Sequence, residues 1–532
     1  MKNIKTGITF GVIGGLLTFL FGGWSVTMIG LFLGVGLGLG LSGRFERSKP
    51  LDIVKQVLPV ASASAGVLLA LSLIQNYLVD PSIGKLPRDI GTVIFANLLG
   101  VLGVIILTTL TASFHGLSEA KERSARLMLL ALLVLAFPFI DKFTELRWTA
   151  QIIFALIFVI LGLGLNIVVG YAGLLDLGYA AFFAIGAYTT GILSSPVHNI
   201  QWNFWLVILI AAGVAALSGL ALGAPTLPLR GDYLAIVTLG FGEIVPVIFK
   251  NLIDVTIKEP ITCWILPGLI GLFGGTSSIA CYTFPWVNGL KFEHVDLTFG
   301  EKGISPIGRP SLPFIGEFES SNPITWYFLI IAIILLSVFL INRLRESRLG
   351  RAWMAIREDE LAASQMGIDP VRTKLLAFAM GATFSGFAGA FYAAYIRGIF
   401  PSVFDFSASI IILSCVILGG LGNVNGVIVG GLALMTADRL FLPALKDFLK
   451  GLLDHSALPW LSQHLPAAVA PVAQNANPIL YRFLLFGLTL VIMMAVRPEG
   501  LIPSAQRRME LHASDEEIAL EAAAKLKSEK KR

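Results

Sequence analysis

The feature that most limits the fold of this chain is its series of apolar runs, many of them long enough to cross a lipid bilayer. A helix needs about 20 apolar residues to span the hydrocarbon core, and only helices and closed barrels satisfy all their backbone groups there. Of the 532 residues, 55% are hydrophobic and only 14% are charged, well below the charged fraction of soluble domains. We therefore predict an all-α fold, a polytopic bundle of transmembrane helices.

The predicted spans are separated by polar linkers. They cover residues 6–23, 26–42, 56–79, 90–114, 126–140, 148–170, 178–194, 203–222, 233–250, 323–342, 374–396, 407–436 and 480–497. The glycine-rich segment 407–436 is too long for one simple span, so we expect two short helices or one broken helix. Gly30, Gly34 and Gly38 recur at four-residue spacing, which is typical of closely packed membrane helices.

Positive charge predicts the orientation, because cytoplasmic linkers carry an excess of Lys and Arg. The basic residues of 1–5, 44–55, 121–126 and 343–357 all fall on one side. This places the N-terminus in the cytoplasm, and the C-terminus as well if the segment 407–436 crosses an even number of times.

Three parts of the chain differ in character. Residues 1–147 form plain additional spans, 148–505 contain all the unusual motifs, and 506–532 form a polar cytoplasmic tail. Within the middle part, 254–322 is expected to be an outer loop and 343–373 a cytoplasmic loop.

Glycines interrupt two apolar runs at Gly170, Gly173 and Gly178. A broken membrane helix exposes backbone groups that only protein or a watery cavity can satisfy. In transporters such breaks often hold zwitterionic substrates at helix ends. The motif predicts either part of a substrate pathway or a tight turn between two ordinary spans, and Asp176 in it is either functional or interfacial.

A carboxylate lies inside a predicted span at Glu243, after Arg230 and Asp232 mark the beginning of that span. A charge at this depth costs roughly 2.5–3.5 kcal/mol on insertion scales. We expect Glu243 to face the bundle interior or a pathway, with pairing to a neighbouring helix for packing alone as the alternative.

Two further motifs lie in linkers. Residues 351–366 favour a helix that Gly367 can end and Pro370 cannot continue. This compact helix could dock into a partner, or the loop could simply be basic and solvated. Asn423 and Asn425 lie in the break of 407–436, where they could bind substrate or satisfy freed backbone groups.

Cys263 and Cys281 share the predicted outer loop, an oxidising compartment in which disulfides persist, so we expect them to pair. Cys415 lies in an apolar run and is expected to be a packing residue. The histidines show no metal-ligand spacing, and we expect no metal site and no cofactor.

Three classes of function are disfavoured. No basic patch is interleaved with aromatic residues, which argues against nucleic-acid binding. No nucleophile motif or acid pair at useful spacing supports an enzyme. The phosphate-loop pattern G-x-x-x-x-G-K-[ST] is absent from the sequence, so this chain cannot power transport with ATP by itself.

Taken together, the motifs of residues 150–505 resemble the permeases of ABC importers for branched-chain amino acids, specifically the LivM type. The resemblance is carried by the stretches RGDYLAIVTLGFGEI, GISPI, LGRAWMAIREDE and RPEGLIP, in that order. Long members of the family carry additional N-terminal spans, which 1–147 resemble. The chain departs from many relatives at Leu174 and Asp176, where they have Gln and Ser.

The resemblance implies the transmembrane permease subunit of an ATP-driven importer in the bacterial inner membrane. Its partners would be a second permease, two ATPase subunits and a periplasmic substrate-binding protein. The pattern E-x-A-A-x-x-x-G resembles the family's ATPase-coupling loop. The residues in question are Glu360, Ala362, Ala363 and Gly367, with Arg351 and Arg357 as anchors of the loop.

Two alternatives remain at this point. Permeases for urea or short amides share much of the same pattern. An ion-coupled secondary transporter acting alone also fits the missing phosphate loop, but such a transporter has no ATPase to which a helix at 351–367 could dock.

Overall fold

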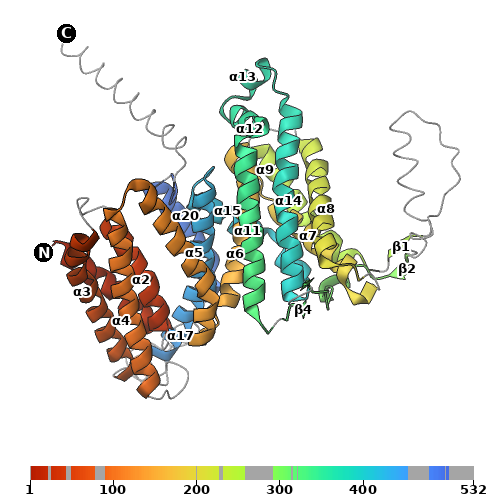
Figure 1. Cartoon of the computed structure of the whole chain (residues 1–532). Helices are drawn as coiled ribbons and strands as arrows, with labels where there is room; N and C mark the ends of the chain where they lie inside the picture. Colours follow the sequence, from red (N-terminus) through yellow and green to blue (C-terminus); the bar gives the residue numbers. More distant parts are fainter. Residues whose placement is uncertain are drawn as a thin grey trace, which may run out of the picture. The chain divides into compact units, whose positions relative to one another are not determined.

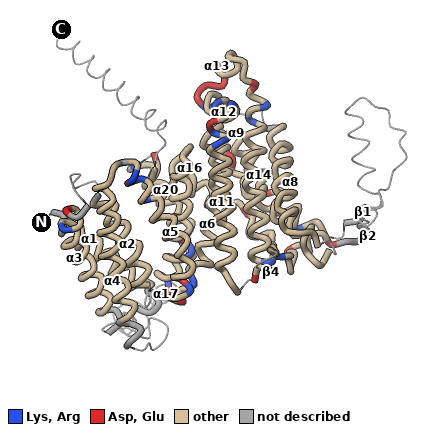
Figure 2. Tube along the Cα trace, in the orientation of Figure 1, with Lys and Arg blue, Asp and Glu red and all other residues tan. Residues whose placement is uncertain are grey.

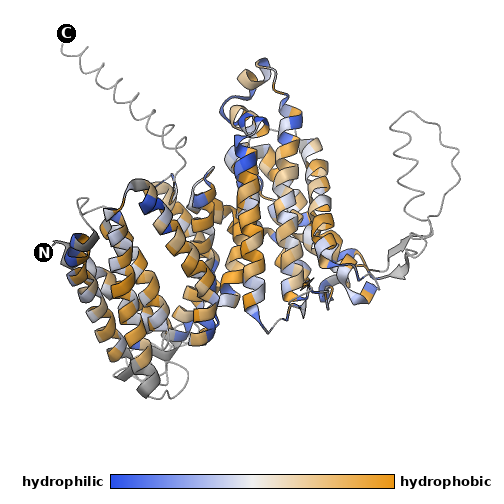
Figure 3. Cartoon of the chain, viewed as in Figure 1, coloured by the Kyte–Doolittle hydropathy of each residue, from blue (hydrophilic) through white to orange (hydrophobic). Residues whose placement is uncertain are grey.

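A computed structural model gives the fold and confirms the all-α prediction (Figure 1). In the residues it describes, eleven helices are long and apolar enough to cross a membrane, and their apolar surfaces dominate Figure 3. The described residues are 2–21, 25–42, 50–77, 90–198, 201–226, 232–253, 255–257, 292–312, 316–319, 321–452, 478–497 and 499–502.

The chain divides into two compact units. The first consists of Met1–Phe154 and Met435–Gly487, and the second of Ala155–Leu434 and Leu488–Arg532. The unit boundary falls inside helix α6, seven residues after the predicted beginning of the motif-rich part at residue 148.

The first unit is a bundle of helices with short helical segments at its ends. Its elements are α1 (Lys2–Phe21), α2 (Ser25–Ser42), α3 (Pro50–Tyr77), α4 (Ile90–Ser113), η2 (Phe114–Gly116), α5 (Glu119–Thr144), η7 (Ala437–Phe441), α17 (Leu442–Leu452) and η9 (Pro478–Tyr481). Five helices, α1 to α5, therefore precede α6 in the described part of the chain.

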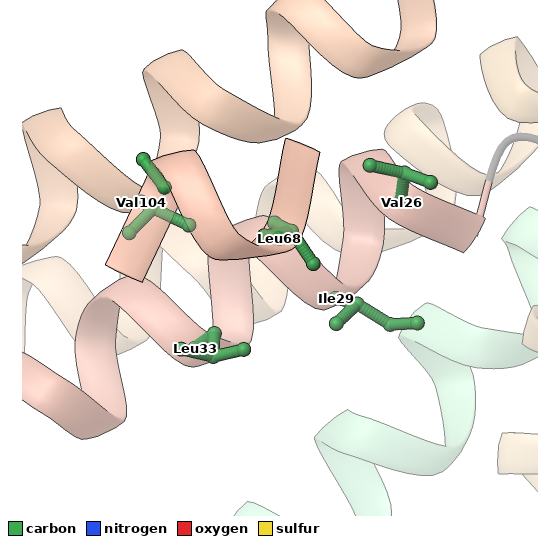
Figure 4. Close-up of a cluster of buried hydrophobic side chains, with 6 residues drawn as sticks. Val26, Ile29, Leu33, Leu68 and Val104 are labelled. Atoms are coloured by element: carbon green, nitrogen blue, oxygen red, sulfur yellow. The ribbon is translucent and has the colours of Figure 1, made fainter. Parts of the chain in front are cut away.

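Helices α2 and α4 pack closely through glycines. A Cβ on Gly30 would lie 2.3 Å from the carbonyl oxygen of Gly100, and one on Gly34 would lie 2.8 Å from that of Gly103. The packing role predicted for the glycine repeat is thus confirmed. Beside this contact lies an apolar cluster drawn in Figure 4, which includes Val26, Ile29, Leu33, Leu68 and Val104.

The second unit contains the remaining elements, with α6, α16 and α20 crossing the boundary between units. They are α6 (Trp148–Leu165), η3 (Asn166–Tyr171), α7 (Tyr179–Ser194), η4 (Pro196–His198), α8 (Phe204–Thr226), α9 (Asp232–Asn251), β1 (Val255–Ile257), β2 (Phe292–Val295), η5 (Gly300–Lys302), β3 (Ser311–Leu312), β4 (Gly316–Glu317), α11 (Pro323–Glu346), α12 (Arg348–Glu358), α13 (Glu360–Gln365), α14 (Pro370–Ile396), η6 (Pro401–Val403), α15 (Phe406–Gly419), α16 (Val424–Thr436) and α20 (Arg482–Val496). Strands β1 and β2 pair antiparallel, as do β3 and β4.

Helix α14 forms the centre of the second unit. Most of its side chains are buried, and it packs against both α7 and α8. Gly386 allows this close approach, since a Cβ there would lie 2.8 Å from the backbone of Ala211 and Ala212. The interior of this unit is therefore built around one buried helix, as expected where small residues let membrane helices approach.

For two segments the structure tests the predicted helices: it confirms the break expected within residues 407–436 and corrects the single helix expected over residues 351–366. Residues 407–436 form two helices, α15 and α16, and Gly420 and Gly422 between them adopt positive φ values of 115° and 78°. Residues 351–366 do not form one helix: Asp359 is extended and separates α12 from α13. Its side chain accepts hydrogen bonds from Leu361 and Ala362, so it begins a new helix instead of continuing the first.

One end of the second unit is closed by contacts between loops. Ser195 Oγ donates to the carbonyl oxygen of Pro306 at 2.7 Å, and Trp205 Nε1 donates to that of Ser311 at 2.9 Å. Ile304 and Ile399 form an isolated antiparallel bridge. The loops that follow α7, α9 and α14 thus meet at this end, opposite to the end that carries α12 and α13 (Figure 1).

Candidate functional site

The predicted break after the sixth span is present as a change in helix type. Helix α6 passes into the π-helix η3, and the regular helix resumes only at α7. Asn166 at the beginning of η3 is fully buried, and its Oδ1 accepts a hydrogen bond from the Gly422 N–H at 2.9 Å. The breaks at 166–178 and 420–423 are therefore directly bonded to each other.

The turn between η3 and α7 is held by side chains from other helices. Gly173 adopts φ +72°, which reverses the chain. The Leu177 N–H donates to Thr238 Oγ1 at 3.1 Å, and the Ala180 N–H donates to Ser409 Oγ at 3.0 Å. Because these two N–H groups already donate to side chains of other helices, they are not available to a substrate. The turn is therefore better suited to positioning the helices than to binding a substrate.

Asp176 is almost completely buried in this turn, outside the helices that could span the membrane. Its Oδ1 accepts from the Gly178 N–H at 2.9 Å, and its Oδ2 has no hydrogen-bond partner among the described residues. Burial raises the pKa of the carboxyl to about 7, although the hydrogen bond from Gly178 acts in the opposite direction. The group therefore changes charge near neutral pH.

Arg357 joins α12 to the break. Its Nη1 donates to the carbonyl oxygen of Gly170 at 2.6 Å. The aliphatic part of the side chain lies against Gly173, where a Cβ would come within 2.8 Å of Arg357 Cγ. Two of the predicted pathway glycines and one of the predicted coupling residues are thus in direct contact.

A partly buried ion pair joins α13 to α14. Lys374 Nζ lies 2.6 Å from Glu360 Oε1, and the Lys374 side chain is 8% exposed. The preceding helix is fixed as well, because Trp353 is fully buried and its Nε1 donates to the carbonyl oxygen of Thr373. Helices α12 and α13 are therefore firmly attached to the bundle and do not form a loose solvated loop.

The tip of this helix pair is apolar and exposed. Leu361 is 65% and Met366 84% exposed, and Ala362 is exposed with them. Ala363, by contrast, is buried. Gly367 ends the tip with φ +85°, and a Cβ there would meet nothing within 4 Å.

Charged residues surround the apolar tip. Figure 2 shows both signs of charge gathered around α12 and α13, whereas α8 and α14 are mostly uncharged along their length. Arg351 is exposed here and donates to the carbonyl oxygen of Glu346 on the preceding helix. An apolar patch with a charged rim has the composition of a protein-binding surface.

Asn423 and Asn425 lie at the beginning of α16. Asn423 Oδ1 accepts from the Asn425 N–H at 3.1 Å, and Asn423 Nδ2 donates to the carbonyl oxygen of Ile502 at 3.0 Å. Asn425 itself is exposed. Asn423 therefore satisfies backbone groups near the break, which is one of the two roles predicted for these residues.

Glu243 lies on the exposed face of α9, not inside the bundle of this chain. With Ile244, Val247, Ile248 and Asn251 it lines an open hollow of about 360 Å³. Within the second unit, Glu243 therefore does not face the interior of the bundle. A pathway beside α9 and pairing with another helix both remain predictions.

Three of the predicted residues lie outside the described residues: Cys263, Cys281 and Arg230. The disulfide between the two cysteines therefore remains a prediction. Cys415 is buried, as expected for a packing residue. Among the described residues, no group of three His, Cys, Asp or Glu side chains is close enough to hold a metal ion.

Two residues of the site were not singled out from sequence. Both are buried: Asn166 bonds to Gly422, 256 residues further along the chain, and Lys374 joins the consecutive helices α13 and α14. Each is a polar or charged residue within or at the beginning of an apolar run. That position is a signal for a buried partner, although it does not identify the partner.

The comparisons with known proteins agree with this architecture. The family described as "Branched-chain amino acid transport system / permease component" matches residues 148–493. The LivM permease proteins of the high-affinity branched-chain amino acid transport systems of Escherichia coli and Salmonella typhimurium are 37% and 36% identical over 389 residues, which is 73% of this chain and 77% of each relative. The LivH permease of Salmonella typhimurium is 32% identical over 127 residues, 24% of this chain and 40% of that protein. No solved structure matches the chain.

Proposed function

The chain belongs to the family of permease components of branched-chain amino acid transport systems, and from this premise we propose that it is the LivM-type membrane subunit of an ATP-driven importer of leucine, isoleucine and valine. It is a multi-pass membrane protein. The proposal adds the substrates, the energy source, the partners and a location in the bacterial inner membrane.

A second permease is supported by the comparisons. The chain is similar to LivM proteins over most of its length and to LivH proteins over a shorter stretch, so the two permease types are related to each other. Two related membrane subunits are expected to pair about a pseudo-twofold axis. The partner of this chain would be the LivH-type permease.

Docking of an ATPase is supported by the tip of α13. Leu361 and Met366 expose apolar surface at the end of the bundle where charges gather, and the positive-inside rule places this end in the cytoplasm. The substrate-binding protein would then dock at the opposite end, where the loops after α7, α9 and α14 meet.

The observation that carries the proposal is the contact between Arg357 and Gly170. A nucleotide-driven movement can shift a membrane pathway only through contacts that differ between the two states. Helix α13 is attached to α14 by the Glu360–Lys374 ion pair, and α12 is attached to the break by Arg357. Movement at the tip can therefore reach two membrane elements through rigid, directly bonded parts.

Reconstitution tests the proposal. The chain, the LivH-type permease, both ATPase subunits and the binding protein are placed in proteoliposomes, and uptake of labelled leucine is measured with and without ATP. We expect ATP-dependent uptake that excess isoleucine and valine inhibit. Uptake of urea without leucine would contradict the substrate class, and leucine uptake driven by an ion gradient without the ATPase subunits would contradict the energy source.

A further inference from the structure

Helix α9 presents a continuous exposed face along its whole length. Tyr233 is 72% exposed, Ile236 63% and Val247 54%, and Glu243 and Asn251 are exposed on the same side. The spacing of three to four residues between them is that of one helix face. No other described element of this unit covers it.

Lipid is a poor neighbour for this face because a carboxylate lies near its middle. Glu243 is 11 residues into α9, about 16 Å along the helix axis, which is near the middle of a hydrocarbon core of about 30 Å. An exposed carboxylate there costs roughly 2.5–3.5 kcal/mol. The exposed face of α8 offers the contrast, since Leu206, Leu209 and Leu217 make it apolar and suited to lipid.

Glycine provides a second, independent observation on the same face. A Cβ on Gly240 would meet nothing within 4 Å, whereas a Cβ on Gly242, two residues away, would lie 2.8 Å from the Cα of Gly178. Gly242 is thus explained by packing inside the chain and Gly240 is not. A small residue on an exposed membrane helix permits close approach by a helix from another subunit.

The hollow of about 360 Å³ lies on this face and begins at Glu243, one turn after Gly240, with Ile244, Val247, Ile248 and Asn251 as the rest of its lining. A carboxylate in a largely apolar hollow at mid-membrane depth is stable if a protein surface closes the hollow from lipid and water or a zwitterion can enter. The observations that disfavour lipid contact therefore favour contact with a protein partner that leaves space around Glu243.

We propose that the exposed face of α9 binds the second permease subunit, the relative of LivH type, with a helix of that subunit crossing at Gly240 and enclosing Glu243 in the seam between the two chains. The inference rests on the proposed function for the existence of this partner. A related subunit is the fitting occupant because it carries membrane helices of the same kind, and because the chain is itself similar to LivH proteins.

Two leucine substitutions at matched glycines test the interface. Gly240→Leu places a side chain into the proposed crossing, whereas Gly213→Leu does the same on the apolar face of α8, where a Cβ also meets nothing within 4 Å. A Cβ at either position meets no described atom within 4 Å, so both variants should insert and melt like the native protein. Co-purification of the tagged chain with the LivH-type permease should fall at least tenfold for Gly240→Leu and remain unchanged for Gly213→Leu.

Photo-crosslinking identifies the occupant directly. A benzoylphenylalanine at Val247 should crosslink to the LivH-type permease in the full complex, and one at Leu217 should capture no protein. A crosslink from Val247 to a second copy of this chain, or to no protein, would overturn the proposal. Equal loss of the partner in both leucine variants would also overturn it, because the effect would then not depend on α9.

Failure of the interface and failure of the proposed function can be told apart. If Gly240→Leu retains the partner and the complex transports leucine, the α9 interface is wrong and the function stands. If the native complex takes up no leucine while Val247 still crosslinks to the LivH-type permease, the interface stands and the substrate assignment is wrong.

Discussion

At the scale of single residues, the second unit places ionisable side chains at points where their charge has consequences. Arg357 bridges α12 and the break, Lys374 pairs with Glu360 inside the bundle, and Asp176 is buried with one oxygen unpartnered. Buried charged groups contribute through their partners, and removing one partner is costly. Asp176 and Arg357 therefore each give a prediction, as does Glu243 on the exposed face of α9.

Asp176→Asn should stabilise the protein in a pH-dependent way. The carboxyl has a pKa of about 7 in the folded protein against 3.8 when unfolded, so the folded state binds the extra proton between these values. The free energy of unfolding therefore falls as pH rises from about 4 to about 7 and stays low above it, by an amount of the order of 4 kcal/mol. Asparagine keeps a side-chain oxygen that accepts the hydrogen bond from the Gly178 N–H. Because asparagine does not ionise, the variant does not lose this free energy of unfolding as pH rises.

Thermal unfolding of the detergent-purified protein at pH 5.5 and pH 8 measures the effect. The variant should melt higher than the native protein at pH 8, with a smaller difference at pH 5.5. An equal difference at both values would show that ionisation of Asp176 is not responsible.

Glu243→Gln should reduce leucine transport without dissociating the complex. The amide is nearly the same size and less costly in the membrane, but it cannot attract the ammonium group of an amino acid. Leucine uptake should fall about tenfold or more, equivalent to at least about 1.4 kcal/mol. Glu301→Gln is the matched control, because that carboxylate is 83% exposed beyond the end of α9 and pairs with Lys250. Unchanged uptake in the Glu243 variant would remove this residue from the pathway.

Arg357→Ala should uncouple the ATPases from the membrane part. A hydrogen bond from a charged group contributes about 1.5–3 kcal/mol, so its loss should lower leucine uptake roughly tenfold or more while the ATPase subunits still co-purify. Arg372→Ala serves as control, since Arg372 is 83% exposed and pairs with Asp369 one turn before it. Loss of ATPase binding in the Arg357 variant would instead place this residue in the docking surface.

At the scale of elements, α12 and α13 form a rigid projection whose two alanines have opposite environments. Ala362 is exposed and Ala363 is buried. Enlarging Ala363 would disturb the chain's own packing before it affected any partner, whereas a large side chain at Ala362 projects outward. The structure thus identifies Ala362 as the cleaner probe of docking.

Ala362→Trp should block binding of the ATPase subunits while the melting temperature of the isolated chain stays unchanged. Pull-down of the ATPases with the tagged permease measures the first, and thermal unfolding the second. Leu335→Trp on the exposed apolar face of α11 is the control and should bind the ATPases normally. Normal pull-down by the Ala362 variant would mean that the tip of α13 is an ordinary connection.

The elements themselves could be predicted from sequence because their signals are local. Apolar length gave the spans, and glycines gave the breaks at 170–178 and 420–423. The pairing of those breaks could not be predicted, because Asn166 and Gly422 are 256 residues apart and nothing in either segment specifies the other. The outward position of Glu243 was equally hidden, since a membrane helix is apolar towards lipid and towards its neighbours alike.

At the scale of the whole molecule, the division into units does not follow the order of the sequence. Met435–Gly487 groups with Met1–Phe154, although the family match extends to residue 493. A truncation at the proposed boundary after residue 147 therefore does not follow the division into structural units. A fragment beginning at residue 148 keeps the family region but loses the helices with which Met435–Gly487 groups.

The five helices described before α6 also determine on which side of the membrane α6 begins. Five is an odd number, so a chain whose N-terminus is cytoplasmic begins α6 on the outer side of the membrane. Deletion of residues 2–145 would leave α6 to insert from the wrong side, and the projection of α12 and α13 would then face outward, beyond the reach of any ATPase. Fusing one unrelated membrane helix ahead of α6 should restore the parity. In a chain whose Cys263, Cys281 and Cys415 are replaced by Ser, a Met366→Cys variant should react with a membrane-impermeant thiol reagent in intact cells only in the deletion. Labelling of the full-length chain at this position would reverse the proposed orientation.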